Sequence, residues 1–91
     1  MEIKIEQLKK CFGEKVAVDI DTYTIHSGDM IGLVGNNGAG KTTTFYMIVG
    51  LIKPNEGRIF LENDEGVVTD ITKLPVYRRA QMGVGYLAQE A

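Results

Sequence analysis

The chain has 91 residues, of which 44% are hydrophobic and 24% charged, and its formal net charge is -2. This composition is typical of a soluble globular domain and excludes a disordered tail or a basic nucleic-acid-binding arm, so we expect no nucleic-acid partner. A single cysteine, Cys11, rules out an internal disulfide; no apolar run approaches the roughly 20 residues that span a bilayer, so any membrane role is expected to be peripheral.

The N-terminal segment predicts two antiparallel strands. Apolar and polar residues alternate in segments 3–8 and 16–20, which are separated by a turn at residues 13–15. We expect the second strand to continue to Ile25 with a change of register near Asp21, in a sheet with one solvated face.

The next two elements are a buried strand and an amphipathic helix. Residues 30–34 are apolar on both faces, as in a strand buried within a parallel sheet. Residues 41–51 predict a helix that ends at Gly50 and Pro54. Its buried stripe is expected to consist of residues spaced i, i+3, i+4 and i+7, namely Phe45, Ile48, Val49 and Ile52.

A turn at residues 53–57 and a strand at 58–62 follow the helix. The acidic stretch 63–72 is interpreted as an exposed loop, with the alternative that Val67 and Val68 extend a hairpin. Pro75 is expected to open a short helix that reaches residue 82.

The end of the chain predicts one more strand. Gly83 is placed to follow the end of the preceding helix, and residues 84–87 have the apolar pattern of a short strand that leads to Gln89.

The loop between the buried strand and the helix carries the phosphate-binding pattern G-x-x-x-x-G-K-[ST]. It consists of Gly35, Asn36, Asn37, Gly38, Ala39, Gly40, Lys41 and Thr42. Glycines let the backbone turn tightly, so that successive N–H groups point at phosphate oxygens, and the helix N-terminus adds about half a positive charge. A strand before the loop and a helix after it form the arrangement that this mechanism requires.

Three side chains of the loop have distinct predicted roles. Lys41 is expected to reach the β- and γ-phosphates, and the Thr42 hydroxyl to bind Mg²⁺. Thr43 is expected to donate to the α-phosphate. The alternative interpretation is a glycine-rich turn with an exposed lysine.

On these residues the chain resembles the N-terminal part of an ABC-type ATPase, the nucleotide-binding subunit of a membrane transporter. Residues 35–44 are similar to the family's Walker A segment, and 84–90 to the strand that enters its Q-loop. Asn36 departs from the family's usual proline. Segments 40–59 and 70–91 resemble the ATP-binding subunit of lipopolysaccharide export. The resemblance implies an α/β P-loop NTPase (ABC ATPase-like) fragment with an antiparallel β subdomain.

The resemblance also assigns roles outside the loop. Phe12 lies where the family carries its aromatic A-loop residue, so Phe12, with Val18, would pack on the adenine ring of ATP. Gln89 would be the Q-loop glutamine that helps to hold Mg²⁺. The alternatives are a place for Phe12 in the hydrophobic cluster of the strand turn, and for Gln89 no role beyond that of a polar residue. His26 does not match the family's switch histidine.

The family's hydrolytic groups are not identifiable in residues 1–91, which lack the signature segment, the Walker B carboxylate and the switch histidine. Asp19 and Glu62 follow apolar runs, but on strands expected to be antiparallel and half-exposed. No catalytic residue is therefore assigned. We predict a truncated ABC-type nucleotide-binding domain over residues 1–91 that binds Mg-ATP with little hydrolysis.

The resemblance further implies partners and a location. The family couples ATP hydrolysis to transport at the cytoplasmic face of the inner membrane, together with membrane subunits and a second ATP-binding subunit. An unpaired edge at residues 30–34 would favour a homo-oligomer or edge-strand pairing. The alternatives are a stand-alone phosphate- or nucleotide-binding P-loop module, natural or designed, and a structural fragment that binds no nucleotide.

Overall fold

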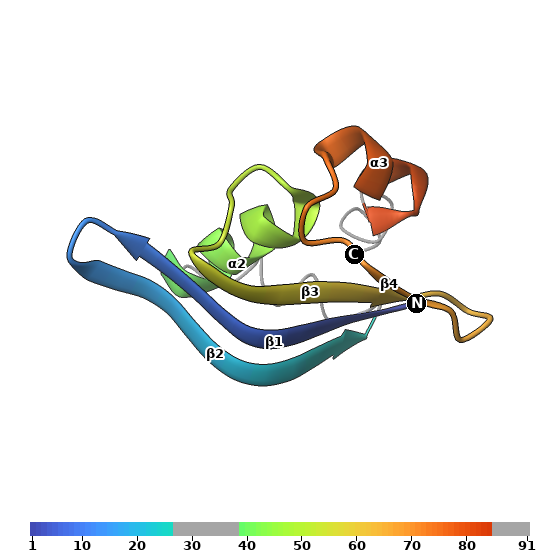
Figure 1. Cartoon of the computed structure of the whole chain (residues 1–91), viewed down its shortest axis with the longest axis horizontal. Coiled ribbons are helices and arrows are strands. Elements are labelled where there is room, and N and C mark those ends of the chain that lie inside the picture. The colour runs from blue at the N-terminus through green and yellow to red at the C-terminus, as the bar shows by residue number, and fades with distance from the viewer. Residues whose placement is uncertain (27–38, 85–91) are drawn as a thin grey trace.

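The computed structural model describes residues 1–26 and 39–84. In this part of the chain a four-stranded antiparallel sheet has the strand order β2-β1-β3-β4. Figure 1 shows both helices on the same side of this sheet. The elements are β1 (Glu2–Phe12), β2 (Lys15–His26), α2 (Ala39–Val49), β3 (Glu56–Glu62), β4 (Val68–Asp70) and α3 (Val76–Gln81).

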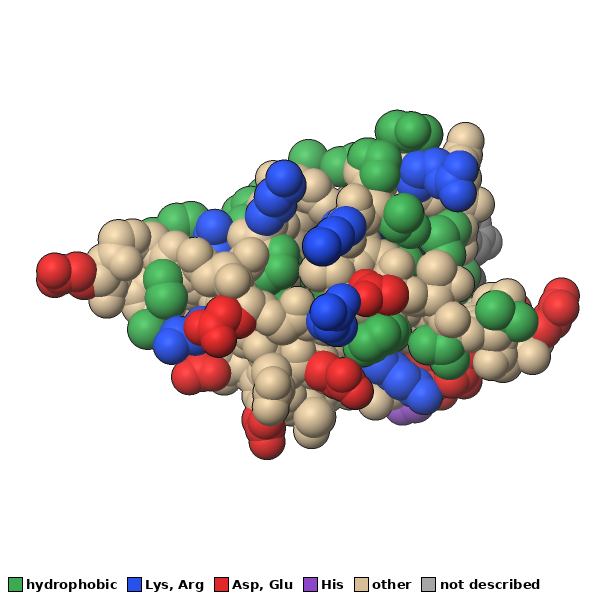
Figure 2. Space-filling view, in the orientation of Figure 1, with side chains coloured by type: hydrophobic (Ala, Val, Ile, Leu, Met, Phe, Trp, Pro, Cys, Tyr) green, Lys and Arg blue, Asp and Glu red, His purple; other side chains and the backbone are tan. Residues whose placement is uncertain are grey.

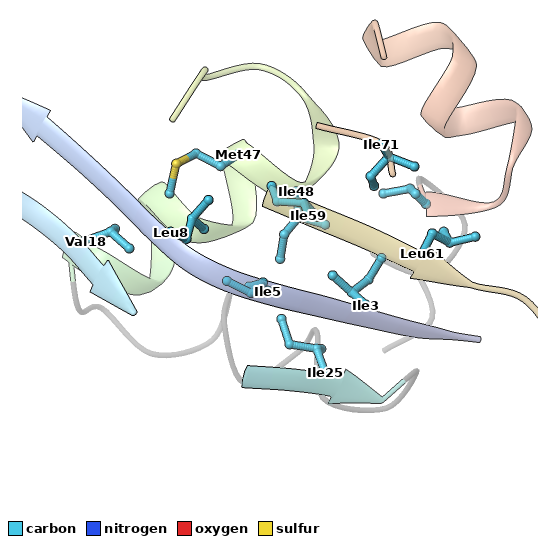
Figure 3. Packing of buried hydrophobic residues seen from close by; sticks show 11 residues of the cluster. Ile3, Ile5, Leu8, Val18, Ile25, Met47, Ile48, Ile59, Leu61 and Ile71 are labelled. Carbon is cyan, nitrogen blue, oxygen red and sulfur yellow. The ribbon is translucent and has the colours of Figure 1, made fainter. Parts of the chain in front are cut away.

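The core lies between the helices and one face of the sheet (Figure 3). Neighbouring strands contribute directly paired residues to it, such as Ile3 with Leu61 and Ile5 with Ile59. Next to these buried positions the same strands carry charged side chains that form ion pairs across the strands, as Lys4 does with Glu62. The predicted sheet with one buried face is therefore confirmed. The buried cluster consists of Ile3, Ile5, Leu8, Val18, Ile25, Met47, Ile48, Ile59, Leu61, Ile71 and Val84.

The predicted helix after the glycine loop is also confirmed, as α2. Ile48 is fully buried, whereas Phe45, Val49 and Ile52 are partly buried against the core. Met47, which the expected stripe did not include, is fully buried as well. Neither α2 nor α3 is long and apolar enough to cross a membrane. The predicted strand at 30–34 lies outside the described residues.

The change of register expected near Asp21 is present in the side chains of β2, whose buried residues Val18 and Ile25 are an odd number of positions apart. It is not a shift in strand pairing, which continues from Leu8–Ile20 to Glu6–Thr22; the β1–β2 register shifts between Lys10 and Cys11 instead. A second irregularity lies in β1, where the register with β3 shifts between Glu6 and Lys9 and Gln7 has a φ of 49°. This irregularity explains why the buried positions of β1 change from odd to even numbers between Ile5 and Leu8.

The segment expected to be a loop at 63–72 contains a hairpin. Residues of β4 pair with β3 from Phe60–Asp70 to Glu62–Val68. The turn is closed by Asn63, whose side-chain oxygen accepts hydrogen bonds from the N–H groups of Glu65 and Val67, both at 2.9 Å. The alternative of a hairpin is therefore confirmed for Val68, whereas Val67 lies in the turn. Two of the three acidic residues, Asp64 and Glu65, lie in the turn as well, and Asp70 is the last residue of β4.

The short helix α3 is confirmed with Pro75 as its N-cap and Met82 as its C-cap. Gly83 follows with a φ of 100°, which suits a residue just past a helix end. Val84 is fully buried, but its backbone is helical and not extended as expected. Residues 85–87 of the expected strand lie outside the described residues.

The close approach of β3 to β1 at Gly57 generates a stability prediction. Gly57 has a φ of 100°, and a Cβ atom there would lie 2.6 Å from Leu8 Cα. Gly57→Ala should therefore lower the free energy of unfolding by about 3 kcal/mol, from backbone strain and steric overlap together. The measurement is urea unfolding followed by far-UV circular dichroism.

Gly66→Ala is the matched control, since Gly66 has a φ of 83° but no atom within 4 Å of its added Cβ. This variant should lose only about 1 kcal/mol. Equal losses in the two variants would contradict the role of the β1 contact.

Candidate functional site

The first turn of α2 packs directly on the backbone of β2. A Cβ atom on Gly40 would lie 3.0 Å from the carbonyl oxygen of Ala17, so any larger residue would push the helix away from the strand. The hydroxyl of Thr44 donates a 2.6 Å hydrogen bond to the carbonyl oxygen of Gly40, one turn earlier. The contact with Ala17 therefore fixes the distance between the start of α2 and strand β2.

The side chains of the first turn divide between solvent and core. Lys41 and Thr42 are exposed, whereas Thr43 is only 9% exposed. A lysine ammonium and a threonine hydroxyl thus project from the positive end of the α2 dipole, where an anion is stabilised. Of the remaining predicted loop residues, Gly35, Asn36, Asn37 and Gly38 lie outside the described residues, as does Gln89.

The described part of the chain contains no group of three or more His, Cys, Asp or Glu side chains that could hold a metal ion. Thr42 is exposed and carries a hydroxyl oxygen, a type of ligand that suits Mg²⁺, so its role as a Mg²⁺ ligand stays a prediction.

Phe12 and Val18 occupy different environments. Phe12 is 51% exposed at the end of β1, and the Lys10 ammonium lies 5.2 Å from its ring centroid. Val18 is only 5% exposed and is paired with Lys10 across the strands. Directly paired residues lie on the same face of a sheet, and so do residues two apart on one strand. Phe12 therefore lies on the same face as Val18, but at the end of the strand, where that face is open to solvent. The Phe12 ring is thus available for stacking, and a Val18 contact with adenine stays a prediction.

Asn55 joins the turn after α2 to the end of β1. Its backbone N–H donates to the carbonyl oxygen of Lys9 at 2.8 Å, and its side-chain oxygen accepts from the N–H of Cys11 at 2.7 Å. These bonds hold β1 just before Phe12. The sequence marked Asn55 only as a turn residue and gave no sign of this contact.

Arg79 is the buried charged residue of this region, with 4% of its surface exposed. Its Nη1 donates to the carbonyl oxygens of Met47 and Ile48, at 2.6 and 3.0 Å, in the last turn of α2. Its Nε and Nη2 donate to the carbonyl oxygens of Leu74 and Thr72, at 2.8 and 2.9 Å. One guanidinium therefore ends α2 and fixes the segment that leads into α3.

Burial lowers the pKa of the Arg79 guanidinium. Sequence reasoning missed this residue. The available signal was its position three residues after Val76 and three before Met82, a spacing that places all three on one face of a helix.

Thr72 belongs to a hydrogen-bonded connection that follows β4. Its hydroxyl donates to Asp70 Oδ1 at 2.6 Å and accepts a bond from the Ile59 N–H at 2.8 Å. The Thr72 hydroxyl, with Arg58 as a further donor, holds the pKa of Asp70 below its usual value. This connection fixes the backbone carbonyl of Thr72 that Arg79 uses.

Comparison with protein families gives a match over most of the chain. The family described as "ABC transporter" matches residues 18–91. A solved structure, described as a nucleotide-free ATP-binding cassette from an ABC transporter, superposes with a TM-score of 0.66 and 28% identity, over 91% of this chain and 31% of that one. The described residues therefore have the fold of part of an ABC ATPase cassette, an α/β P-loop NTPase fragment with an antiparallel β subdomain.

Curated relatives are also similar in sequence. The lipopolysaccharide export system ATP-binding protein LptB of Acidithiobacillus ferridurans is 47% identical over 97% of this chain and 34% of its own length. LptB of Escherichia coli (strain K12) is 48% identical over 87% of this chain and 30% of its own. A probable ABC transporter ATP-binding protein of Azorhizobium caulinodans is 48% identical over 92% and 28%. The chain thus spans about a third of the length of these relatives.

The contacts of Arg79 generate a prediction. Arg79→Met should lower the free energy of unfolding by about 3 kcal/mol or more, because it leaves buried carbonyl groups of α2 and of the 72–74 segment without donors. Arg78→Met, at an exposed position of the same helix, should change it by no more than about 0.5 kcal/mol. Urea unfolding of both variants measures the difference, and a similar small effect in both would refute the capping role.

Proposed function

Because the chain belongs to the ABC transporter family, we propose that it holds the phosphates of ATP, together with Mg²⁺, at the N-terminal end of α2. The observation that supports this function best is the exposure of Lys41 and Thr42 on the first turn of a helix that packs on the hairpin carrying Phe12. A cation, a hydroxyl and an aromatic ring are thereby supplied by two elements fixed to each other.

Different residues are proposed to bind the phosphates, the Mg²⁺ ion and the adenine ring. Backbone N–H groups from Gly35 to Thr43 surround the phosphates, and Lys41 neutralises charge on the β- and γ-phosphates. Thr42 and Gln89 are the proposed protein ligands of Mg²⁺, which would offset the negative charge of the phosphates. Phe12 offers its ring to adenine, with Val18 beneath it.

The wider role is that of an ATP-binding subunit that couples ATP hydrolysis to transport. Similarity to the lipopolysaccharide export proteins favours lipopolysaccharide as the exported substrate. In this role the protein would act at the cytoplasmic face of the membrane with membrane subunits and a second ATP-binding subunit. We assign no catalytic carboxylate within residues 1–91, so this chain alone should bind Mg-ATP with little turnover.

The alternative function is a phosphate-binding P-loop module without a transport role. Such a module would recognise a triphosphate through α2 and would gain nothing from the base. The exposed ring of Phe12 favours a nucleotide over a bare phosphate chain.

Lys41→Ala tests the phosphate site. It should weaken Mg-ATP binding about tenfold or more, the effect of losing one charge-assisted hydrogen bond. Lys53→Ala removes the same charge beyond the opposite end of α2 and should leave Mg-ATP affinity within about twofold, as expected for an exposed charge. Isothermal titration calorimetry measures both constants. Equal affinity in Lys41→Ala and the unmodified chain would rule out this phosphate site.

Phe12→Ala tests the adenine platform. Removal of the ring should weaken Mg-ATP binding about fivefold, the effect of roughly 1 kcal/mol of stacking, while binding of Mg-tripolyphosphate stays unchanged. A titration with each compound separates the base from the phosphates. If Phe12→Ala weakens the binding of both compounds equally, or of neither, the result would favour the module that binds phosphate alone.

A further inference from the structure

A second cavity lies at the opposite end of α2 from the phosphate site. Its volume is about 600 Å³, within the range of small-molecule sites. It is bounded by the turn after α2, the start of β3 and the segment that leads into α3. The side chains that matter for its chemistry are those of Lys53, Glu56, Lys73, Leu74, Pro75 and Arg79.

The cavity is cationic on a chain that is acidic overall. Lys53, Lys73 and Arg79 line it, and Glu56 is the carboxylate among its described lining residues. The charge of the lining is thus three positive and one negative, or +2, whereas the formal charge of the whole chain is -2. Figure 2 shows Lys and Arg side chains gathered over the upper half of this face, and most Asp and Glu side chains along its lower half and tips.

Arg79 supplies the second observation. Its four hydrogen bonds all go to backbone carbonyl groups, and no carboxylate of the described residues forms an ion pair with it. Each nitrogen of the guanidinium therefore has a partner among residues 1–26 and 39–84, but every one of these partners is a neutral carbonyl group. Buried charges are normally paired, and the depressed pKa of this group reflects its desolvation. An anion in the adjoining cavity would supply the missing countercharge.

We propose that this cavity binds a small anion, a phosphate- or carboxylate-bearing molecule whose charged group lies near Arg79 between Lys53 and Lys73. Leu74 and Pro75 offer apolar wall to the rest of the molecule. The site does not depend on the nucleotide site, because it uses none of the residues at the N-terminal end of α2. Gly50, which follows the last residue of α2, also lines it, so a ligand there touches the end of the phosphate-binding helix.

The experiment is an NMR titration of the ¹⁵N-labelled chain with inorganic phosphate and, separately, with citrate, at constant ionic strength. Amide shifts are expected in segments 50–57 and 72–75 with both probes. Lys53→Met/Lys73→Met should weaken binding roughly two- to thirtyfold, the range for two exposed ion pairs. Lys41→Ala should leave it intact, which separates this site from the phosphate site of α2.

Lys9→Met/Lys15→Met is the matched control, since it removes the same total charge from the N-terminal hairpin. The proposal stands if the control stays within twofold of the unmodified chain while Lys53→Met/Lys73→Met weakens binding. It fails if both double variants lose affinity equally, which indicates diffuse electrostatics. It also fails if the shifts are confined to residues 39–43 or are absent with both probes. Because none of the changed lysines is buried, a folded spectrum is expected for each variant.

Discussion

The hydrogen bonds of Arg79 hold together the half of the structure that lies above the sheet. The last turn of α2 and the segment after β4 present carbonyl groups that need donors, and one guanidinium, carried by α3, supplies them. The five-donor fork of arginine suits this task, because it reaches carbonyl groups of two segments from a third. A lysine has the charge but not the planar geometry.

The position of α2 follows from constraints at its two ends. At the first turn, Gly40 allows the helix to touch the backbone of β2 at Ala17. In its last turn, Met47 and Ile48 are buried in the core, and beyond its end Asn55 ties the following turn to β1. A helix fixed at its start and at its end holds the backbone of Lys41 and Thr42 in place. Rigid placement of this kind is what a phosphate site requires, since ordering the site then costs little when the ligand binds.

The sequence predicted those features that depend on local periodicity or on turn chemistry. Alternation in segments 3–8 and 16–20 gave the β1–β2 hairpin, and the spacing from Phe45 to Ile52 gave α2. The loop interpretation of segment 63–72 was incomplete and its hairpin alternative was the better one, because two of the three acidic residues lie in a short turn and three residues suffice for the strand that follows. The change of alternation in β2 was found near Asp21, whereas the shift in β1–β2 pairing lies elsewhere, because alternation shows which face a residue occupies and not how two strands are paired.

The candidate site divides in the same way. The pattern from Gly35 to Thr42 predicts phosphate binding because its chemistry is local, whereas Arg79 and Asn55 act on segments distant in sequence, which composition cannot reveal. Val18 was predicted from resemblance as an adenine contact, and the structure places its side chain in the hydrophobic core.

The electrostatics of α2 explain why a cationic cavity at its far end requires Arg79. A helix carries about half a negative charge at its C-terminus, so that end repels anions while the N-terminus attracts them. Arg79 donates to the carbonyl groups of Met47 and Ile48, and its full positive charge outweighs the partial charge of the helix end. The electrostatic potential at the C-terminal end of α2 is therefore positive instead of negative, and Lys53 and Lys73 make it more positive. The same guanidinium thus ends the helix and makes the adjoining cavity suitable for an anion, so both ends of α2 favour negative charge.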